Sequence, residues 1–337
     1  MRLLVIVLFS FTMIGCSGSV DLSTDFPIPP PSPAATPIDK LKTKVDPDLE
    51  KEFAKIAAQA KGKVGVAAIV IETGDAAFLN ADQRFPMQSV FKLPIAMALM
   101  EQVLRGEFNL DEKVGVITED FVRKGMASAL RDKNPQGGEF TIRELIRLSL
   151  VDSDGTASDV LMRIAGGADE IQSYLTRIGV ADMKVVNTEK EIGRDWETQY
   201  QNRATPTASV DLLRWLWAAY QAERGDAKDE NDSSRANLTG ARLLIKFMAE
   251  SNTGPKRLKG LLAKGGIFVA HKTGTGGTRN GIISATNDIG LMSVGEGKTV
   301  AVAVFVSDSS ADERTRELVI AKIAKSVWDM WSTRPSR

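Results

Sequence analysis

Hydrophobic and polar positions are spaced differently at the ends and in the middle of the chain. The runs "KVGVAAIVIET" (63–73) and "AAFLNAD" (76–82) are short, apolar and joined by a Gly-Asp turn. Such runs between turn residues predict a β-hairpin. Between about 89 and 263, most apolar positions instead recur at helical spacing. Three late runs again predict strands: "GIFVAHKTG" (266–274), "IISATNDIGLMSV" (282–294) and "KTVAVAVFVSD" (298–308).

Several helices have recognisable limits. "DPDLEKEFAKIAAQAK" (46–61) has helical spacing, and Thr141 with Glu144 forms a capping box at the start of "TIRELIRLSL". The polar stretch "RGDAKDENDSSR" (224–235) predicts a solvated loop between helices. The last helix, Ala311–Trp331, is expected to bury one face. That face comprises Leu318, Ala321, Ala324, Val327, Trp328 and Trp331.

Strands at both ends around a helical middle indicate the architecture. We expect an α/β fold of the α+β type, in which one mainly antiparallel sheet is assembled from both termini. The terminal helix then packs on one face of the sheet, and an all-helical lobe lies beside it. In such a fold the active site is expected at the seam between the sheet and the lobe.

The N-terminus predicts export. A basic start and the apolar run Leu3–Ile14 identify residues 1–15 as a secretory signal, too short to span a bilayer comfortably. Cys16 follows Gly15 in a sequence similar to a bacterial lipobox, which makes it the expected lipidation site; the alternative is an ordinary signal with an incidental Cys. The Pro-rich stretch 16–45 is expected to be a tether, and 46–337 the folded domain. We therefore expect a periplasmic, membrane-anchored lipoprotein.

Composition excludes several mechanisms. The chain has 43 basic and 43 acidic residues, so it has no excess of basic residues that would indicate binding to nucleic acid. One Cys and one His leave no material for a disulfide or a multi-Cys metal site, and we expect neither metal nor organic cofactor. A Ser-His-Asp site would have to use His271. A hydrolase here is therefore expected to use a base other than His.

A serine and a lysine stand three residues apart ahead of an apolar helical run. They are Ser89 and Lys92 in "SVFK". Residues at this spacing share a helix face, so the lysine amine is expected beside the serine hydroxyl. A desolvated lysine near other cations can lose its proton and act as a base. A lone Ser-x-x-Lys string is nevertheless a weak signal.

Two further motifs make the signal specific. Ser153-Asp154-Gly155 follows the helix at 141–150, and Lys272-Thr273-Gly274 lies on a predicted strand. With "RFPMQSVFKLPIA" around Ser89, they resemble the three motifs of serine β-lactamases and penicillin-binding proteins. The resemblance covers about 50–333 and is greatest to class A β-lactamases. "MQSVFKLPIA" and "ATNDIG" are similar to an extended-spectrum cephalosporinase branch.

The resemblance implies a catalytic role for each of several motif residues. Ser89 would attack the lactam carbonyl, Lys92 would assist proton removal, and Ser153 would relay a proton to the leaving nitrogen. Class A enzymes take a deacylating glutamate from an omega-shaped loop, which "NTEKEIGRDWETQYQNRATP" resembles. This loop offers Glu189 and Glu191, and the family spacing favours Glu189.

The resemblance also implies how substrate is held. Lys272 would support Ser153 electrostatically and bind the substrate carboxylate with Thr273, beside Gly274 and Thr275. Backbone N–H groups of Ser89 and Thr275 would form the oxyanion hole. The implied substrates are β-lactams, and we expect a monomer.

Three positions depart from the family pattern, and a fourth residue could compensate for one of them. Gly155 and Gly193 stand where Asn is usual, which would remove one hydrogen bond near the substrate and one support for the hydrolytic water. Thr286 stands where some relatives have Arg. Arg257, predicted to lie on a neighbouring helix, could supply the carboxylate-binding charge instead, or be a surface residue.

The sequence leaves two other functions open, and it also leaves the role of His271 open. A penicillin-binding D,D-carboxypeptidase or transpeptidase shares the first three motifs, and a β-lactam sensor would bind covalently without turnover. Glu189 separates the hydrolase from the penicillin-binding enzyme, whereas a sensor is expected to carry an attached membrane-spanning helix and a signalling domain. His271 either tunes the charge of Lys272 or is a strand residue satisfied by local hydrogen bonds, and Asp154 is expected to fix the loop that carries Ser153.

Overall fold

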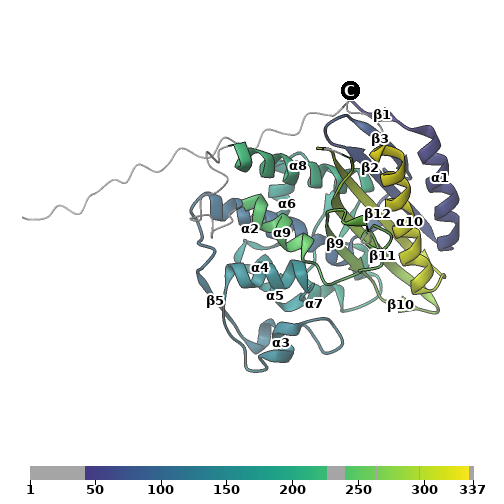
Figure 1. Ribbon diagram of the computed structural model, residues 1–337. Coiled ribbons are helices and arrows are strands. Elements are labelled where there is room, and N and C mark those ends of the chain that lie inside the picture. The colour runs from purple at the N-terminus through teal and green to yellow at the C-terminus, as the bar shows by residue number, and fades with distance from the viewer. Residues whose placement is uncertain (1–41, 226–239, 263–264, 296, 334–337) are drawn as a thin grey trace, which may run out of the picture.

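The computed structural model describes residues 42–225, 240–262, 265–295 and 297–333 (Figure 1). The predicted signal at 1–15, Cys16 and nearly all of the polar segment at 224–235 lie outside these ranges. No helix within the ranges combines the length and the apolar character needed to cross a membrane.

A seven-stranded sheet forms the centre of the fold. Its order is β1–β3–β2–β12–β11, and both β9 and β10 pair with β11. Every pairing is antiparallel except that of β1 with β3, which confirms the prediction of one mainly antiparallel sheet built from both termini. The strands are β1 Lys44–Val45, β2 Lys63–Val70, β3 Asp75–Leu79, β9 Val269–Thr275, β10 Thr278–Arg279, β11 Ile282–Ser293 and β12 Thr299–Ser309. Because β1 pairs with β3, the described fold begins two residues before the predicted boundary at 46.

Both faces of the sheet are covered, which explains why β2 after Lys63 and β12 from Val300 to Val306 are apolar without interruption. On β12, Val304 and Phe305 are both fully buried, although successive side chains point to opposite faces. One face packs against α1 (Pro47–Ala57) and α10 (Glu313–Ser332), which lie together at one side of the molecule (Figure 1).

The terminal helix buries most of its predicted face, since Ala321, Ala324, Val327 and Trp331 are buried and Trp328 is partly buried. The residues of α10 buried against the sheet include Val319, Ile320, Ile323 and Val327. The prediction that Leu318 lies in the buried face is wrong, because its side chain is 38% exposed. The centre of the buried face passes through 320, 324, 327 and 331, and Leu318 lies almost half a helical turn away from it.

The helical lobe covers the other face of the sheet. Helix α2 (Lys92–Leu104) runs through its centre and is apolar on nearly all sides, as expected of a fully buried helix. The Thr141–Glu144 capping box is present at the start of α4. The other helices are α3 Ala129–Lys133, α4 Ile142–Val151, α5 Gly155–Ile164, α6 Gly167–Arg177, α7 Glu189–Ile192, α8 Pro206–Gly225 and α9 Gly240–Ala249.

Further short strands and 3-10 turns, most of them in the lobe, are not evident from the apolar pattern. β4 pairs with β8 and β8 with β7, and a second small sheet joins β5 to β6. The strands are β4 Phe85–Pro86, β5 Lys113–Val116, β6 Gly138–Thr141, β7 Met183–Lys184 and β8 Arg203–Ala204; the 3-10 turns are η1 Ala58–Ala60, η2 Gln88–Phe91, η3 Thr118–Asp120 and η4 Thr198–Tyr200. Because β4 leads into η2, its pairing with β8 holds that turn against the loop that follows α7.

Candidate active site

Ser89 and Lys92 lie where the sheet meets the helical lobe. Ser89 is on η2, which runs directly into α2, and Lys92 is the first residue of α2. Ser89 Oγ donates to Glu189 Oε1 at 3.1 Å, and Lys92 Nζ lies 2.8 Å from the same oxygen. The predicted serine–lysine proximity is therefore mediated by a shared carboxylate oxygen. The Lys92 side chain is only 1% exposed, so this ammonium depends on its protein partners.

Ser153 connects two lysines. Lys92 Nζ donates to the Ser153 carbonyl at 2.6 Å and to its Oγ at 3.3 Å, while Lys272 Nζ donates to Oγ at 2.9 Å. The backbone of Ser153 is left-handed, with a φ of 56°, which is uncommon for a residue with a side chain. This conformation lets one residue present both its carbonyl and its hydroxyl to the cluster.

Asp154 holds the Ser153 loop in place, as predicted. Its carboxylate caps α5 by accepting from the Ala157 N–H at 2.9 Å, and it accepts from Leu130 N–H at 2.8 Å and Ser128 Oγ at 2.9 Å. Since Asp154 is buried and bonded on both oxygens, its position is fixed from three directions.

Only one of the two candidate glutamates faces the cluster. Helix α7 begins at Glu189, whose carboxylate contacts Ser89 and Lys92. Glu191 is exposed and closes a capping box with Thr188. The short helix therefore directs Glu189 inward and assigns Glu191 to its own N-terminus.

Asp159 of α5 belongs to the site although sequence reasoning did not identify it. Its two carboxylate oxygens accept the backbone N–H groups of Glu189 at 2.7 Å and Lys190 at 3.0 Å. Burial raises the pKa of Asp159 to about 7, against the lowering effect of these two hydrogen bonds. The one sequence feature that could have identified Asp159 is its position, one helical turn after Gly155 of the second motif. Nothing in the local sequence connects it to a loop thirty residues away.

Strand β9 brings the third motif to the cluster. Lys272 is fully buried, and burial, aided by the nearby Lys92 ammonium, holds its pKa well below the usual value. Thr273 Oγ1 and Thr253 Oγ1 are 2.6 Å apart, and Thr273 and Thr275 both line the cleft. Position 274 requires a glycine for steric reasons, since a Cβ there would lie 2.3 Å from the Met87 carbonyl oxygen.

Arg257 does not occupy the predicted position. It lies in a turn-rich segment between α9 and β9 instead of on a helix, is 3% exposed, and does not line the cleft. Its guanidinium donates to Thr275 Oγ1 at 2.7 Å, to the Gly274 carbonyl at 3.1 Å, and to Glu317 Oε1 at 3.3 Å. Direct binding of a substrate carboxylate by Arg257 is therefore not supported. The residue acts on the cleft through Thr275.

One loop occupies the space beside both unusual glycines. This loop, residues 121–128, precedes α3. A Cβ on Gly155 would meet Val122 Cγ1 at 3.1 Å, and a Cβ on Gly193 would meet Met126 Sδ at 2.6 Å. The two departures from the family pattern therefore have a common consequence, which is the close approach of loop 121–128 to the cleft.

The cleft has a volume of about 700 Å³, within the usual range for small-molecule sites. Ser89, Lys92, Ser153 and Glu189 line it. Its outer wall includes Trp196, with the Arg279 guanidinium 4.6 Å from the ring centroid. No group of three or more His, Cys, Asp or Glu residues suited to a metal lies in the described part of the chain.

Comparison with known proteins agrees with this geometry. The sequence model of the β-lactamase enzyme family matches residues 48–331. The chain is 33% identical to β-lactamase VEB-1 of Pseudomonas aeruginosa over 284 residues, covering 84% of this chain and 90% of VEB-1. It is 34% identical to the extended-spectrum β-lactamase PER-1 of the same organism, covering 84% and 87%.

Solved structures give the same assignment. A β-lactamase from Chitinophaga pinensis superposes with a TM-score of 0.75 at 35% identity, covering 84% of this chain and 99% of that one. The TLA-1 extended-spectrum β-lactamase superposes with a TM-score of 0.75 at 36% identity, covering 84% and 98%. The chain therefore belongs to the β-lactamase enzyme family, as one of its class A serine enzymes.

Proposed function

We propose that this enzyme hydrolyses β-lactam antibiotics through an acyl-enzyme on Ser89 and thereby confers antibiotic resistance. Ser89 Oγ attacks the lactam carbonyl, the C–N bond breaks, and the nitrogen takes a proton through Ser153. A water molecule then attacks the ester, which releases the opened product and regenerates the Ser89 hydroxyl. Lys92 and Glu189 are the bases available for these two steps.

The contact between Glu189 Oε1, Ser89 Oγ and Lys92 Nζ carries this proposal. One carboxylate oxygen lies within 3.1 Å of the nucleophile and 2.8 Å of the adjacent ammonium. A water held by this carboxylate is within reach of an ester on Ser89, which is the requirement for general-base deacylation. A non-turnover sensor has no need of a carboxylate that can hold a hydrolytic water beside the nucleophile.

The second and third motifs fit the remaining roles. Lys272 Nζ and Lys92 Nζ both donate to Ser153 Oγ, so this hydroxyl can pass a proton toward the leaving nitrogen. The side chains of Thr273 and Thr275 face the cleft and can bind the carboxylate common to β-lactams. We assign the oxyanion hole to the N–H groups of Ser89 on η2 and Thr275 on β9, two elements that pack directly against each other.

We further propose cephalosporins among the substrates, because PER-1 and TLA-1 are both named extended-spectrum enzymes. Hydrolysis of a chromogenic cephalosporin, with and without a chelator, tests the function. Continuous turnover that the chelator leaves unchanged is expected. A stable adduct on Ser89 without turnover would indicate a penicillin-binding protein, and turnover lost with the chelator would contradict the serine mechanism.

We also propose that the enzyme is a monomeric periplasmic lipoprotein attached to the membrane at Cys16. The support is the basic and apolar start of the chain and the position of its one Cys immediately after it. Cys16→Ser is expected to move the enzyme from the membrane fraction to the soluble fraction. Equal partitioning of both forms would leave an ordinary signal peptide as the explanation.

A further inference from the structure

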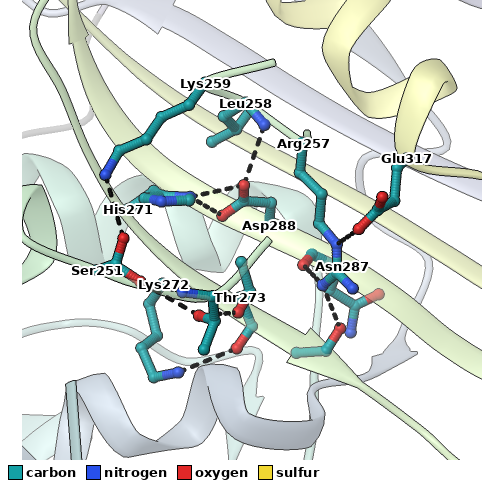
Figure 2. Close-up of polar contacts among 12 residues, drawn as sticks. Ser251, Arg257, Leu258, Lys259, His271, Lys272, Thr273, Asn287, Asp288 and Glu317 are labelled. Atoms are coloured by element: carbon teal, nitrogen blue, oxygen red, sulfur yellow. Dashed lines mark hydrogen bonds and ion pairs between the residues drawn. The ribbon is translucent and has the colours of Figure 1, made fainter. Parts of the chain in front are cut away.

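A buried histidine and aspartate face each other on the side of β9 opposite Lys272. His271 and Asp288 are both 0% exposed. His271 Nδ1 lies 2.8 and 3.0 Å from the two carboxylate oxygens of Asp288 (Figure 2). Figure 2 shows the imidazole ring directed at this carboxylate, while the Lys272 side chain extends in another direction.

The surrounding backbone forms a fitted site for the pair. Gly290 is the partner of His271 in the β9–β11 register, and a Cβ on Gly290 would lie 2.9 Å from His271 Cβ. The Leu258 N–H donates to Asp288 Oδ2 at 3.1 Å, which fixes the carboxylate from the segment before β9. The imidazole therefore has little freedom to turn away from Asp288.

The hydrogen bonds indicate which partner carries the charge. Nδ1 faces two carboxylate oxygens, so it carries a proton and donates. Nε2 is buried and has no hydrogen-bond partner among the described residues. A charged ring would leave a buried Nε2–H donor unsatisfied, which costs more than leaving a neutral acceptor unpaired. The arrangement favours a neutral imidazole beside an ionised Asp288.

Two other buried cations near the cleft have ion-pair partners. Lys92 pairs with Glu189 at 2.8 Å, and Arg257 pairs with Glu317 at 3.3 Å. Lys272 has no carboxylate within ion-pair distance in the described ranges, and its Nζ donates to Ser153 Oγ at 2.9 Å and the Thr273 carbonyl at 3.1 Å. Thr273 is the register partner of Asp288, so this carboxylate lies beside β9 one residue along from Lys272, on the opposite face of the strand.

We propose that His271 and Asp288 form a positioning pair for Lys272, in which the neutral imidazole holds the carboxylate ionised behind β9 and the carboxylate is the counter-charge of the Lys272 ammonium. This inference rests on the proposed function and deepens it. The groups that act on Lys272 are Lys92 and Arg257, which disfavour its charge, and Glu189 and Asp288, which favour it. Asp288 also favours the charge of Lys259, whose Nζ donates to the carbonyl of Ala249 at 2.8 Å.

The sole histidine of the chain allows a direct test of the charge state. Imidazole nitrogen NMR on the untagged wild-type enzyme is expected to show the neutral tautomer with its proton on Nδ1 under the assay conditions. An imidazolium signal would overturn the proposal, because the positive charge of His271 would then neutralise Asp288. This measurement needs no variant and does not depend on turnover.

The pH profile of kcat/KM for a chromogenic cephalosporin tests the effect on Lys272. Asp288→Asn is expected to move the alkaline limb to lower pH, with about a tenfold loss of kcat/KM for each pH unit of displacement. His271→Gln keeps the carboxylate and offers it an N–H, so its limb is expected to stay at the wild-type position. An unshifted limb in folded Asp288→Asn, or an equal shift in both variants, would overturn the proposal.

Failure of this inference and failure of the proposed function are distinguishable. A wild-type enzyme that turns over no β-lactam would contradict the function, while the imidazole spectrum would still decide the charge of the pair. Should Asp288→Asn not fold, the same spectrum remains decisive, since a charged imidazole overturns the proposal and a neutral one supports it.

Discussion

Glu189 is oriented by Asp159 through its main chain. The two N–H groups that open α7 both donate to Asp159, so the direction of the Glu189 side chain depends on a carboxylate that is itself buried. With its pKa raised to about 7, Asp159 changes charge near neutral pH. When protonated, one of its oxygens becomes a donor and no longer suits a backbone N–H.

Asp159 is expected to make deacylation sensitive to pH. As the pH falls through about 7, Asp159 takes up a proton, Glu189 loses part of its support, and kcat should fall. Asp159→Asn is expected to have a lower kcat at alkaline pH and a weaker pH dependence around neutrality. Glu189 and Lys92 are the charged groups that act on Asp159, and both are retained in the variant. An unchanged profile would contradict this role.

The same group affects stability with a definite sign. Its folded pKa of about 7 lies above the ordinary aspartate pKa of 3.8, so between these values the folded protein holds a proton that the unfolded chain has released. Asp159 therefore makes the fold less stable as the pH rises through this window, and the effect levels off above it. Denaturant unfolding across the window should show a smaller decrease for Asp159→Asn than for the wild type.

Lys272 is expected to contribute to both binding and rate. It donates to Ser153 Oγ and lies beside Thr273, so its removal affects proton relay and carboxylate binding together. Lys272→Ala should raise KM and lower kcat, with a loss in kcat/KM on the order of a hundredfold or more, which is typical of a charge placed at a reacting centre. Steady-state kinetics measures both constants, and an unchanged kcat/KM would exclude the role.

At the scale of elements, the site is assembled from short pieces that meet at one seam. Helix α7 has four residues and loop 121–128 has no regular structure over most of its length, yet together they form the wall opposite β9. The two glycines at 155 and 193 make their close packing possible. Such elements are held by side chains from elsewhere in the fold, as Asp154 and Asp159 illustrate.

Restoring a side chain at position 193 is expected to disturb this packing. Gly193→Asn places a Cβ 2.6 Å from Met126 Sδ, so the methionine must move, at a cost of about 1–3 kcal/mol in the free energy of unfolding. Met126→Ala alone leaves a small gap, and the double variant should recover much of the loss. A double-mutant cycle by denaturant unfolding measures this coupling. Additive effects would show that Met126 is not the obstacle.

At the scale of the whole molecule, the sequence predicts those features that depend on the hydrophobic period or the motif of a short segment. The hairpin, the late strands and the capping box at Thr141 follow from short segments, and all are present. The three motifs made the family recognisable before any geometry was known. The proximity of Ser89, Ser153 and Lys272 then follows from the fold that the family implies.

Other features depend on contacts between distant segments and were not predictable. Asp159 reaches a loop thirty residues away, and Arg257 is turned inward by Glu317, sixty residues further along the chain. Leu318 shows the same limit, because the buried side of α10 is set by the sheet on which the helix packs. In each case the partner is absent from the local sequence.

The central claim is that Glu189 deacylates Ser89, and the accumulation of acyl-enzyme tests it most directly. Rapid mixing with a cephalosporin, followed by mass spectrometry, gives the fraction of enzyme that carries the adduct during turnover. Glu189→Gln is expected to accumulate a long-lived adduct on Ser89 with kcat reduced on the order of a hundredfold or more. The matched control, Glu191→Gln, changes an exposed capping residue and should turn over like the wild type. Equal rates of adduct release from the wild type and Glu189→Gln would contradict the account.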